Sequence, residues 1–124
     1  MSRPRFFIAM LFMGELVVPR GSTITSLTGV VPRAERFKLI AEAKLVLYPS
    51  HVDSSPYSVL ESLMLGTLVV AYDIPALRLY YGSTRGVYLV REGDVEALSK
   101  ETIDVLSSRT EEVEPQSLEA GTIY

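Results

Sequence analysis

Residues 45–65, which read LVLYPSHVDSSPYSVLESLML, decide the fold. Four apolar residues of strand length, 45–48, are followed by a polar loop over 49–56. From 56 to 65 the apolar residues recur at helical spacing, and Gly66 supplies a stop. A buried strand, a polar loop and an amphipathic helix, in this order, are typical of one βα unit of a parallel sheet.

Similar segments lie on both sides of this unit. Continuous apolar runs predict further strands, buried on both faces, at residues 6–13, 27–31, 68–72 and 87–90. Helical spacing recurs over residues 33–43 and 94–106. Strands that alternate with helices predict right-handed βαβ units. We therefore expect an α/β, Rossmann-like three-layer domain with a mostly parallel sheet.

The two further helices have defined apolar faces. The first is predicted to present Phe37, Ile40 and Ala41 to the core, and the second Val95, Leu98, Ile103 and Leu106. Asp94 is a candidate N-cap for the second helix. Residues 14–26 lack helical periodicity and contain proline and glycine, which predicts an irregular connection or a hairpin.

The composition indicates one domain. The chain has 124 residues, of which 48% are hydrophobic, enough for a single core, whereas two separate cores would each be marginal. We place the domain at residues 1–106 and treat 107–124 as a polar C-terminal tail. A net charge of −3 argues against a nucleic acid partner.

The absence of cysteine narrows the chemistry further. It excludes a disulfide framework, a thiolate metal site and a cysteine nucleophile, and a reducing cytoplasm is the expected compartment. His51 is the only histidine, so no metal site with several histidines is expected.

The N-terminus resembles a secretory signal, because Arg3 and Arg5 precede the apolar run at 6–13. However, Glu15 interrupts the run, no small-residue cleavage site follows, and a bilayer core of about 30 Å needs a longer helix. We expect a buried strand here. A targeting segment or one making peripheral contact with a membrane is the alternative.

The loop after the first quoted strand is the candidate binding site. Ligands of open α/β sheets bind beyond the carboxyl ends of the strands, where the next helix offers unpaired N–H groups and a positive dipole end that suit a diphosphate. Serine hydroxyls add donors, and carboxylates accept hydrogen bonds from sugar hydroxyls. The residues concerned are Asp53, Ser54, Ser55, Tyr57, Ser58 and Glu61.

The same residues have an ordinary structural explanation. An aspartate or serine before a helix is commonly a cap, and a glutamate on a helix is commonly solvated. His51 fits either a ligand contact or an exposed loop. Tyr80 and Tyr81 fit either stacking on a ligand or the core, and Arg78 and Arg85 fit either a phosphate contact or the surface.

An ordered series of segments carries a family resemblance. The series is Thr28–Pro32 (TGVVP), Ala43–Ser50 (AKLVLYPS), Ser58–Gly66 (SVLESLMLG), Val69–Pro75 (VVAYDIP) and Glu92–Leu98 (EGDVEAL). Over residues 27–103 the chain resembles the C-terminal, donor-binding domain of the family 4 (group 1) retaining glycosyltransferases of the GT-B fold.

The resemblance implies roles for two carboxylates. Glu61 aligns with the glutamate that holds the ribose hydroxyls of the nucleotide. Asp53 aligns with the carboxylate beside the transferred sugar and is the catalytic candidate, although the family commonly has a glutamate followed by a glycine-rich or phenylalanine-containing turn. Ser54, Ser55, Tyr57 and Ser58 are the accompanying binding candidates. The nucleotide sugar is then the donor substrate, and neither a cofactor nor a metal is expected.

Parts of the family pattern have no counterpart. The acceptor-binding N-terminal domain is absent, as is the first βα unit, whose arginine and lysine neutralise the diphosphate. We expect retaining transfer only when an acceptor-binding domain or subunit completes the cleft. A sheet that lacks its first strand has an open edge, which favours a homo-oligomer.

Two other functions share features with this sequence. A non-catalytic remnant or scaffold domain that keeps the fold without turnover is the main alternative. A receiver-type signalling domain is disfavoured, because it needs an acidic pair after its first strand to hold magnesium, and residues 10–14 contain none.

Overall fold

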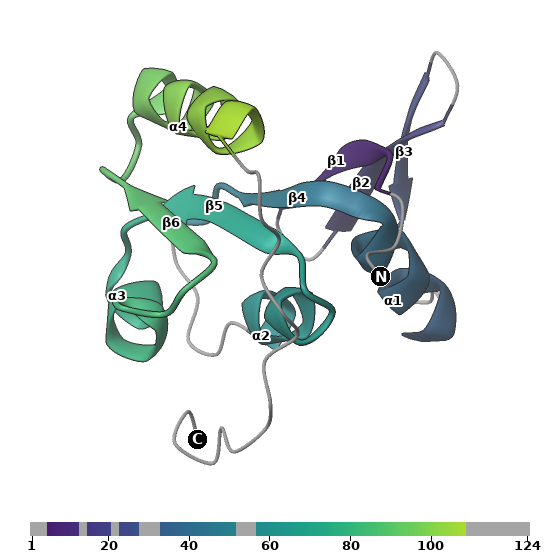
Figure 1. Cartoon of the computed structure of the whole chain (residues 1–124), viewed down its shortest axis with the longest axis horizontal. Helices are drawn as coiled ribbons and strands as arrows, with labels where there is room; N and C mark the ends of the chain where they lie inside the picture. Colours follow the sequence, from purple (N-terminus) through teal and green to yellow (C-terminus); the bar gives the residue numbers. More distant parts are fainter. Residues whose placement is uncertain (1–4, 13–14, 21–22, 28–32, 52–56, 109–124) are drawn as a thin grey trace.

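The computed structural model describes residues 5–12, 15–20, 23–27, 33–51 and 57–108. These form one six-stranded sheet, in the order β3-β2-β1-β4-β5-β6, with helices on both faces (Figure 1). The strands are β1 (Phe7–Phe12), β2 (Glu15–Arg20), β3 (Thr23–Leu27), β4 (Ala43–Tyr48), β5 (Leu68–Tyr72) and β6 (Val87–Val90). The helices are α1 (Arg33–Glu42), α2 (Tyr57–Met64), α3 (Pro75–Tyr81) and α4 (Val95–Ser108).

The parallel part of the sheet is built from β1, β4, β5 and β6. Val46 of β4 pairs with Val69 of β5, which in turn pairs with Val87 of β6. Every residue of β5 is buried, as expected for a strand covered on both faces. The prediction of an α/β, Rossmann-like domain with a mostly parallel sheet is confirmed.

An antiparallel hairpin flanks the parallel part. β2 pairs with β3 and also with β1, so the stretch at 14–26 contains the hairpin that was one of the two predictions for it. The expectation that the sheet ends in an open edge at its first parallel strand is wrong, because β2 covers β1. Of the strand predicted at 27–31, Leu27 is the last residue of β3, and residues 28–32 lie outside the described residues.

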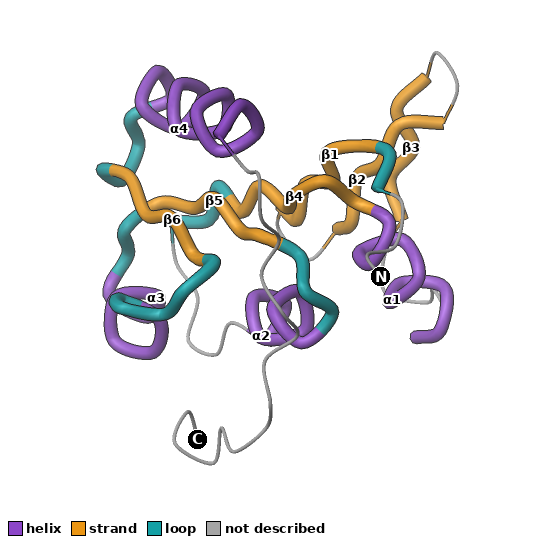
Figure 2. The backbone as a smooth tube through the Cα atoms, viewed as in Figure 1, coloured by secondary structure: helices purple, strands orange, loops and turns teal. Residues whose placement is uncertain are grey.

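The helices form two layers around the sheet. Figures 1 and 2 show α1, α2 and α3 on one face and α4 on the other. α2 packs on β5 and contacts α1, while α4 packs on β5 and β6 from the opposite side. Ile40, Leu63 and Leu77, one from each helix of the first layer, are fully buried. This arrangement sets α1 and α2 side by side, which matters for the site.

The predicted apolar face of α4 is partly wrong. Leu98 is buried, but Val95 and Ile103 are 65% and 62% exposed. The buried residues are instead Leu98, Thr102 and Val105, at the i, i+4 and i+7 positions of one helical stripe, and the predicted Leu106 packs against the core partly buried. Thr102 can be buried because its hydroxyl donates a hydrogen bond to the carbonyl of Leu98.

Arg5 connects the N-terminal segment to the end of α1 and to the turn after α2. Its guanidinium donates hydrogen bonds to the carbonyls of Ala41, Ala43 and Gly66 and to the hydroxyl of Thr67. The strand predicted at 6–13 is β1, which begins one residue later and ends one residue earlier. Among the described residues, no helix is long and apolar enough to cross a bilayer.

Candidate functional site

α2 provides the platform of the candidate site. Val59, Leu60 and Leu63 face the core, and Ser62 is buried with them because its hydroxyl donates to the carbonyl of Ser58 one turn earlier. Gly66 follows the helix with a φ of 76°, a left-handed conformation that glycine adopts without steric cost, and so acts as the predicted stop. Glu61 therefore projects from a helix that is firmly anchored on its other side.

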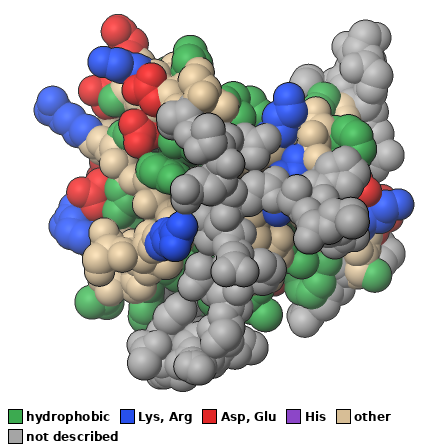
Figure 3. All heavy atoms as spheres, in the orientation of Figure 1, with side chains coloured by type: hydrophobic (Ala, Val, Ile, Leu, Met, Phe, Trp, Pro, Cys, Tyr) green, Lys and Arg blue, Asp and Glu red, His purple; other side chains and the backbone are tan. Residues whose placement is uncertain are grey.

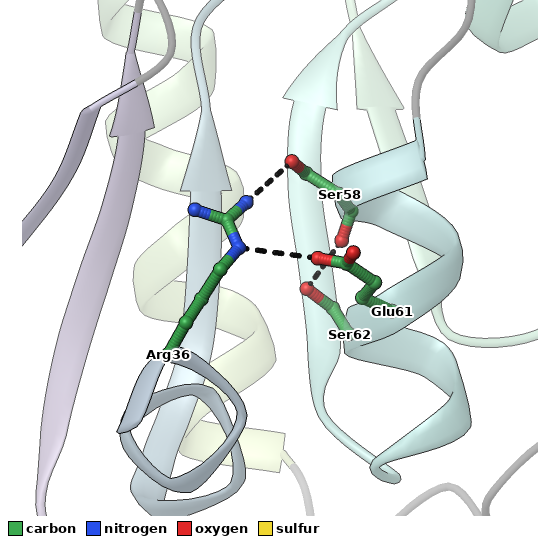
Figure 4. A network of polar contacts seen from close by, with 4 residues as sticks. All are labelled: Arg36, Ser58, Glu61 and Ser62. Carbon is green, nitrogen blue, oxygen red and sulfur yellow. Dashed lines mark hydrogen bonds and ion pairs between the residues drawn. The ribbon is translucent and has the colours of Figure 1, made fainter. Parts of the chain in front are cut away.

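Glu61 is paired with an arginine of the neighbouring helix. Nε of Arg36, on α1, donates to Oε1 of Glu61 at 3.2 Å, and Nη2 of Arg36 donates to Oγ of Ser58 at 2.7 Å (Figure 4). Both side chains of the ion pair are 25% exposed. The pair thus lies at the surface of the α1–α2 contact, accessible to a ligand but less screened than a fully exposed pair.

The arrangement leaves acceptor capacity on Glu61. An ionised carboxylate has two oxygens and only accepts hydrogen bonds. Oε1 receives the bond from Arg36, while Oε2 has no partner among the described residues. In the same sense, Nη1 of Arg36 donates to none of the described residues. One acceptor and one cationic donor are therefore available side by side, a combination that suits a ligand with hydroxyl groups.

The other predicted binding residues divide into two groups. Ser58 lies beside Glu61 and shares its arginine, and Tyr57 is exposed at the first position of α2. Asp53, Ser54 and Ser55 lie outside the described residues, so the catalytic candidate and two of the binding candidates stay predictions.

A second polar contact joins the segments that follow β4 and β6. Nδ1 of His51, just after β4, lies 2.9 Å from Oε2 of Glu92, just after β6. The ring of His51 also lies 5.2 Å from that of Tyr72, the last residue of β5. His51 is 56% exposed. It is thus an exposed loop residue that contacts the ends of neighbouring strands, and its contact with a ligand stays a prediction.

The remaining aromatic and basic candidates differ in burial and in their contacts. Tyr81 is buried in the core, while Tyr80 is exposed. Nε of Arg78 donates to Oδ1 of Asp73 at 2.9 Å, in an exposed pair where α3 follows β5. Arg85 is exposed. Among the described residues, no three side chains of the kinds that bind metals lie close enough together to hold an ion.

Arg36 is the site residue that the sequence did not suggest. It precedes Glu61 by 25 residues, and their contact exists only because α1 and α2 pack side by side. The available signal was indirect: Phe37, Ile40 and Ala41 define the core-facing side of α1, which places Arg36 at the margin of that face. A basic residue in this position reaches along the surface toward the next helix.

The comparisons with known proteins point to one family. A family model described as Glycosyl transferases group 1 matches residues 15–108, about three quarters of the chain. No curated protein and no solved structure matched the chain. The matched segment contains the hairpin, the parallel strands from β4 to β6, and all four helices.

Proposed function

We propose that this chain, which belongs to the glycosyl transferases group 1 family, binds the nucleotide-sugar donor of a glycosyl transfer reaction. The observation that supports this function best is the Glu61 carboxylate, held by Arg36 on one oxygen and open to a ligand on the other among the described residues. The resemblance assigns that carboxylate to the ribose hydroxyls.

The position of Glu61 agrees with the chemistry of such a donor. Glu61 lies one turn into α2, and Ser58 lies in the first turn, where the unpaired backbone N–H groups and the positive end of the helix dipole attract phosphate. A ribose bound by Glu61 thus has its diphosphate near the beginning of the same helix. The nucleotide sugar is a substrate in this proposal, and no separate cofactor takes part.

Transfer itself is a further part of the proposal. Retaining transfer requires an acceptor held opposite the donor and a leaving diphosphate stabilised as the glycosidic bond breaks. We assign the described residues to the donor side only. An acceptor-binding domain or subunit would complete the cleft, with Asp53 beside the transferred sugar.

Calorimetric titration with UDP, GDP and ADP tests the donor site. At least one of the three is expected to bind. Glu61→Ala is expected to weaken that binding by roughly 10- to 150-fold, the equivalent of one charged hydrogen bond of about 1.5–3 kcal/mol. Glu96→Ala is the matched control, because it removes the same charge from an exposed position on α4, on the other face of the sheet.

Two results would count against the proposal. The donor-binding function fails if none of the three nucleotides binds the unmodified chain. The assignment of Glu61 fails if Glu61→Ala and Glu96→Ala bind the nucleotide equally well. Binding of a nucleotide sugar without release of its nucleoside diphosphate, even with acceptor-binding partners present, would instead favour a non-catalytic binding domain.

A further inference from the structure

We infer that Arg36 is a positioning residue that orients Glu61 and balances its charge for binding the donor ribose, an inference that rests on the proposed function. Arg36 reaches Glu61 and Ser58 from α1 at 3.2 Å and 2.7 Å. Neither the resemblance nor the family match assigns it a role. The inference therefore adds a residue to the site and gives α1 a part in it.

The two hydrogen bonds fix the carboxylate geometrically. The guanidinium group is planar, and its donors have fixed directions. Because Nη2 is held by Ser58 on the first turn of α2, Nε meets Oε1 of Glu61 in one defined orientation (Figure 4). Without Arg36, the Glu61 side chain would have several rotamers open to it at the margin of the helix contact. Because the carboxylate is already fixed, less conformational entropy is lost when the ligand binds, and the ligand has less to offset.

The pair also corrects the charge of the site. An unpaired carboxylate one turn inside α2 would repel a diphosphate at the beginning of the helix, and its partly buried position would screen this repulsion less than bulk water does. Arg36 brings the net charge of the pair to zero. It does not occupy Oε2, which has no hydrogen-bond partner among the described residues. Glu61 can then accept from hydroxyl groups without opposing the phosphates that accompany them.

A purely structural role for the pair explains less. Surface ion pairs contribute little to stability. The first helix layer is already anchored by buried side chains, among them Ile40 of α1 and Leu63 of α2. The backbone carbonyl of Ser58 already accepts a hydrogen bond from the Ser62 hydroxyl, so it does not require one from Arg36. The hydrogen bonds of Arg36 are thus directed at the two residues that the proposed function uses.

Discrimination between ribose and its deoxygenated form provides the test. The measurement is the ratio of the dissociation constants of a 2′,3′-dideoxynucleoside diphosphate and the matching ribonucleoside diphosphate, for whichever of UDP, GDP and ADP binds most tightly. The unmodified chain should prefer the ribonucleotide by about tenfold or more. In Arg36→Gln the preference should fall by about threefold or more, because Glu61 is no longer oriented.

Three further variants separate positioning from stability. Arg36→Lys keeps the positive charge but lacks the planar set of donors of the guanidinium group, so it should show a preference for ribose between those of Arg36→Gln and the unmodified chain. Lys38→Gln removes one positive charge from an exposed position on α1 and should leave the ratio unchanged. In the Glu61→Ala background, Arg36→Gln should cause no further loss of preference, since both residues act on the same contact. Thermal melting of each variant establishes that it is folded.

The outcomes are distinguishable. If Arg36→Gln weakens both nucleotides equally and keeps the wild-type preference, Arg36 acts elsewhere and the inference is overturned while the donor site stands. The same holds if its effect adds fully to that of Glu61→Ala. If the unmodified chain shows no preference for ribose, the ribose role of Glu61 fails, and the role of Arg36 fails with it.

Discussion

Arg5 donates a hydrogen bond from Nη1 to Oγ1 of Thr67 at 2.8 Å, and the same hydroxyl donates to the carbonyl of Ile40 at 2.9 Å. Thr67 is fully buried, between the end of α2 and the start of β5. The hydroxyl thereby links the N-terminal segment, the last turn of α1 and the turn after α2. Both helices of the candidate site are fixed relative to each other at this point.

Replacing the hydroxyl of Thr67 should destabilise the fold. Thr67→Val preserves the shape but leaves the carbonyl of Ile40 without this donor and one Arg5 N–H without this acceptor. The free energy of unfolding should fall by about 1–3 kcal/mol, the cost of leaving a buried polar group unpaired. Urea denaturation of the two proteins measures it.

Thr102→Val is the matched control for this change. Thr102 is also buried, at 8% exposure, but its hydroxyl donates to a carbonyl within its own helix. Such i to i−4 bonds add little to helix stability, so the substitution should change the unfolding free energy by less than about 0.5 kcal/mol. Equal effects at the two positions would show that the link to Arg5 and Ile40 does not stabilise the fold.

The N-cap of α4 gives a second stability prediction. Oδ1 of Asp94 accepts a hydrogen bond from the backbone N–H of Ala97 at 2.9 Å, which confirms the predicted cap. Asp94→Ala should lower the free energy of unfolding by about 0.5–2 kcal/mol, whereas Asp94→Asn, which keeps the acceptor, should cost much less. If both variants lose the same amount in urea denaturation, capping by the side chain is not the cause.

The βα units around the site could be predicted because their signals are local. In residues 45–65 the strand, the loop and the helix each have their own pattern, and β4 and α2 follow it to within two residues at their ends. In Figure 3, acidic and basic side chains both gather over α4, whose first turn contains Glu96.

α3 was missed because it is short. Its seven residues have only Leu77 and Tyr81 on the buried side, which is too few repeats to establish a helical period. Pro75 at its beginning was the available sign, since proline is favoured in the first helical turn. The stripe of α4 was misassigned for a different reason. Thr102 pairs its hydroxyl within the helix and takes the buried position expected for Ile103.

Only the part of the site that lies on a single helix could be predicted from the sequence. Ser58 and Glu61 belong to the same segment of sequence, so their proximity follows from helical spacing. Arg36 joins them through packing between α1 and α2, which no pattern in the sequence specifies. The contact of His51 with Glu92 likewise depends on the order of β4, β5 and β6 in the sheet.

The central claim is that a nucleotide donor binds at the contact between α1 and α2, and NMR titration tests it most directly. A ¹⁵N-labelled chain is titrated with whichever of UDP, GDP and ADP binds most tightly, while the backbone amides and the arginine Nε–Hε signals are followed. We predict that the signals of Arg36 Nε–Hε and of the Ser58 and Glu61 amides shift with a common dissociation constant. Shifts confined to α4, or none at any of these three groups, would contradict the account.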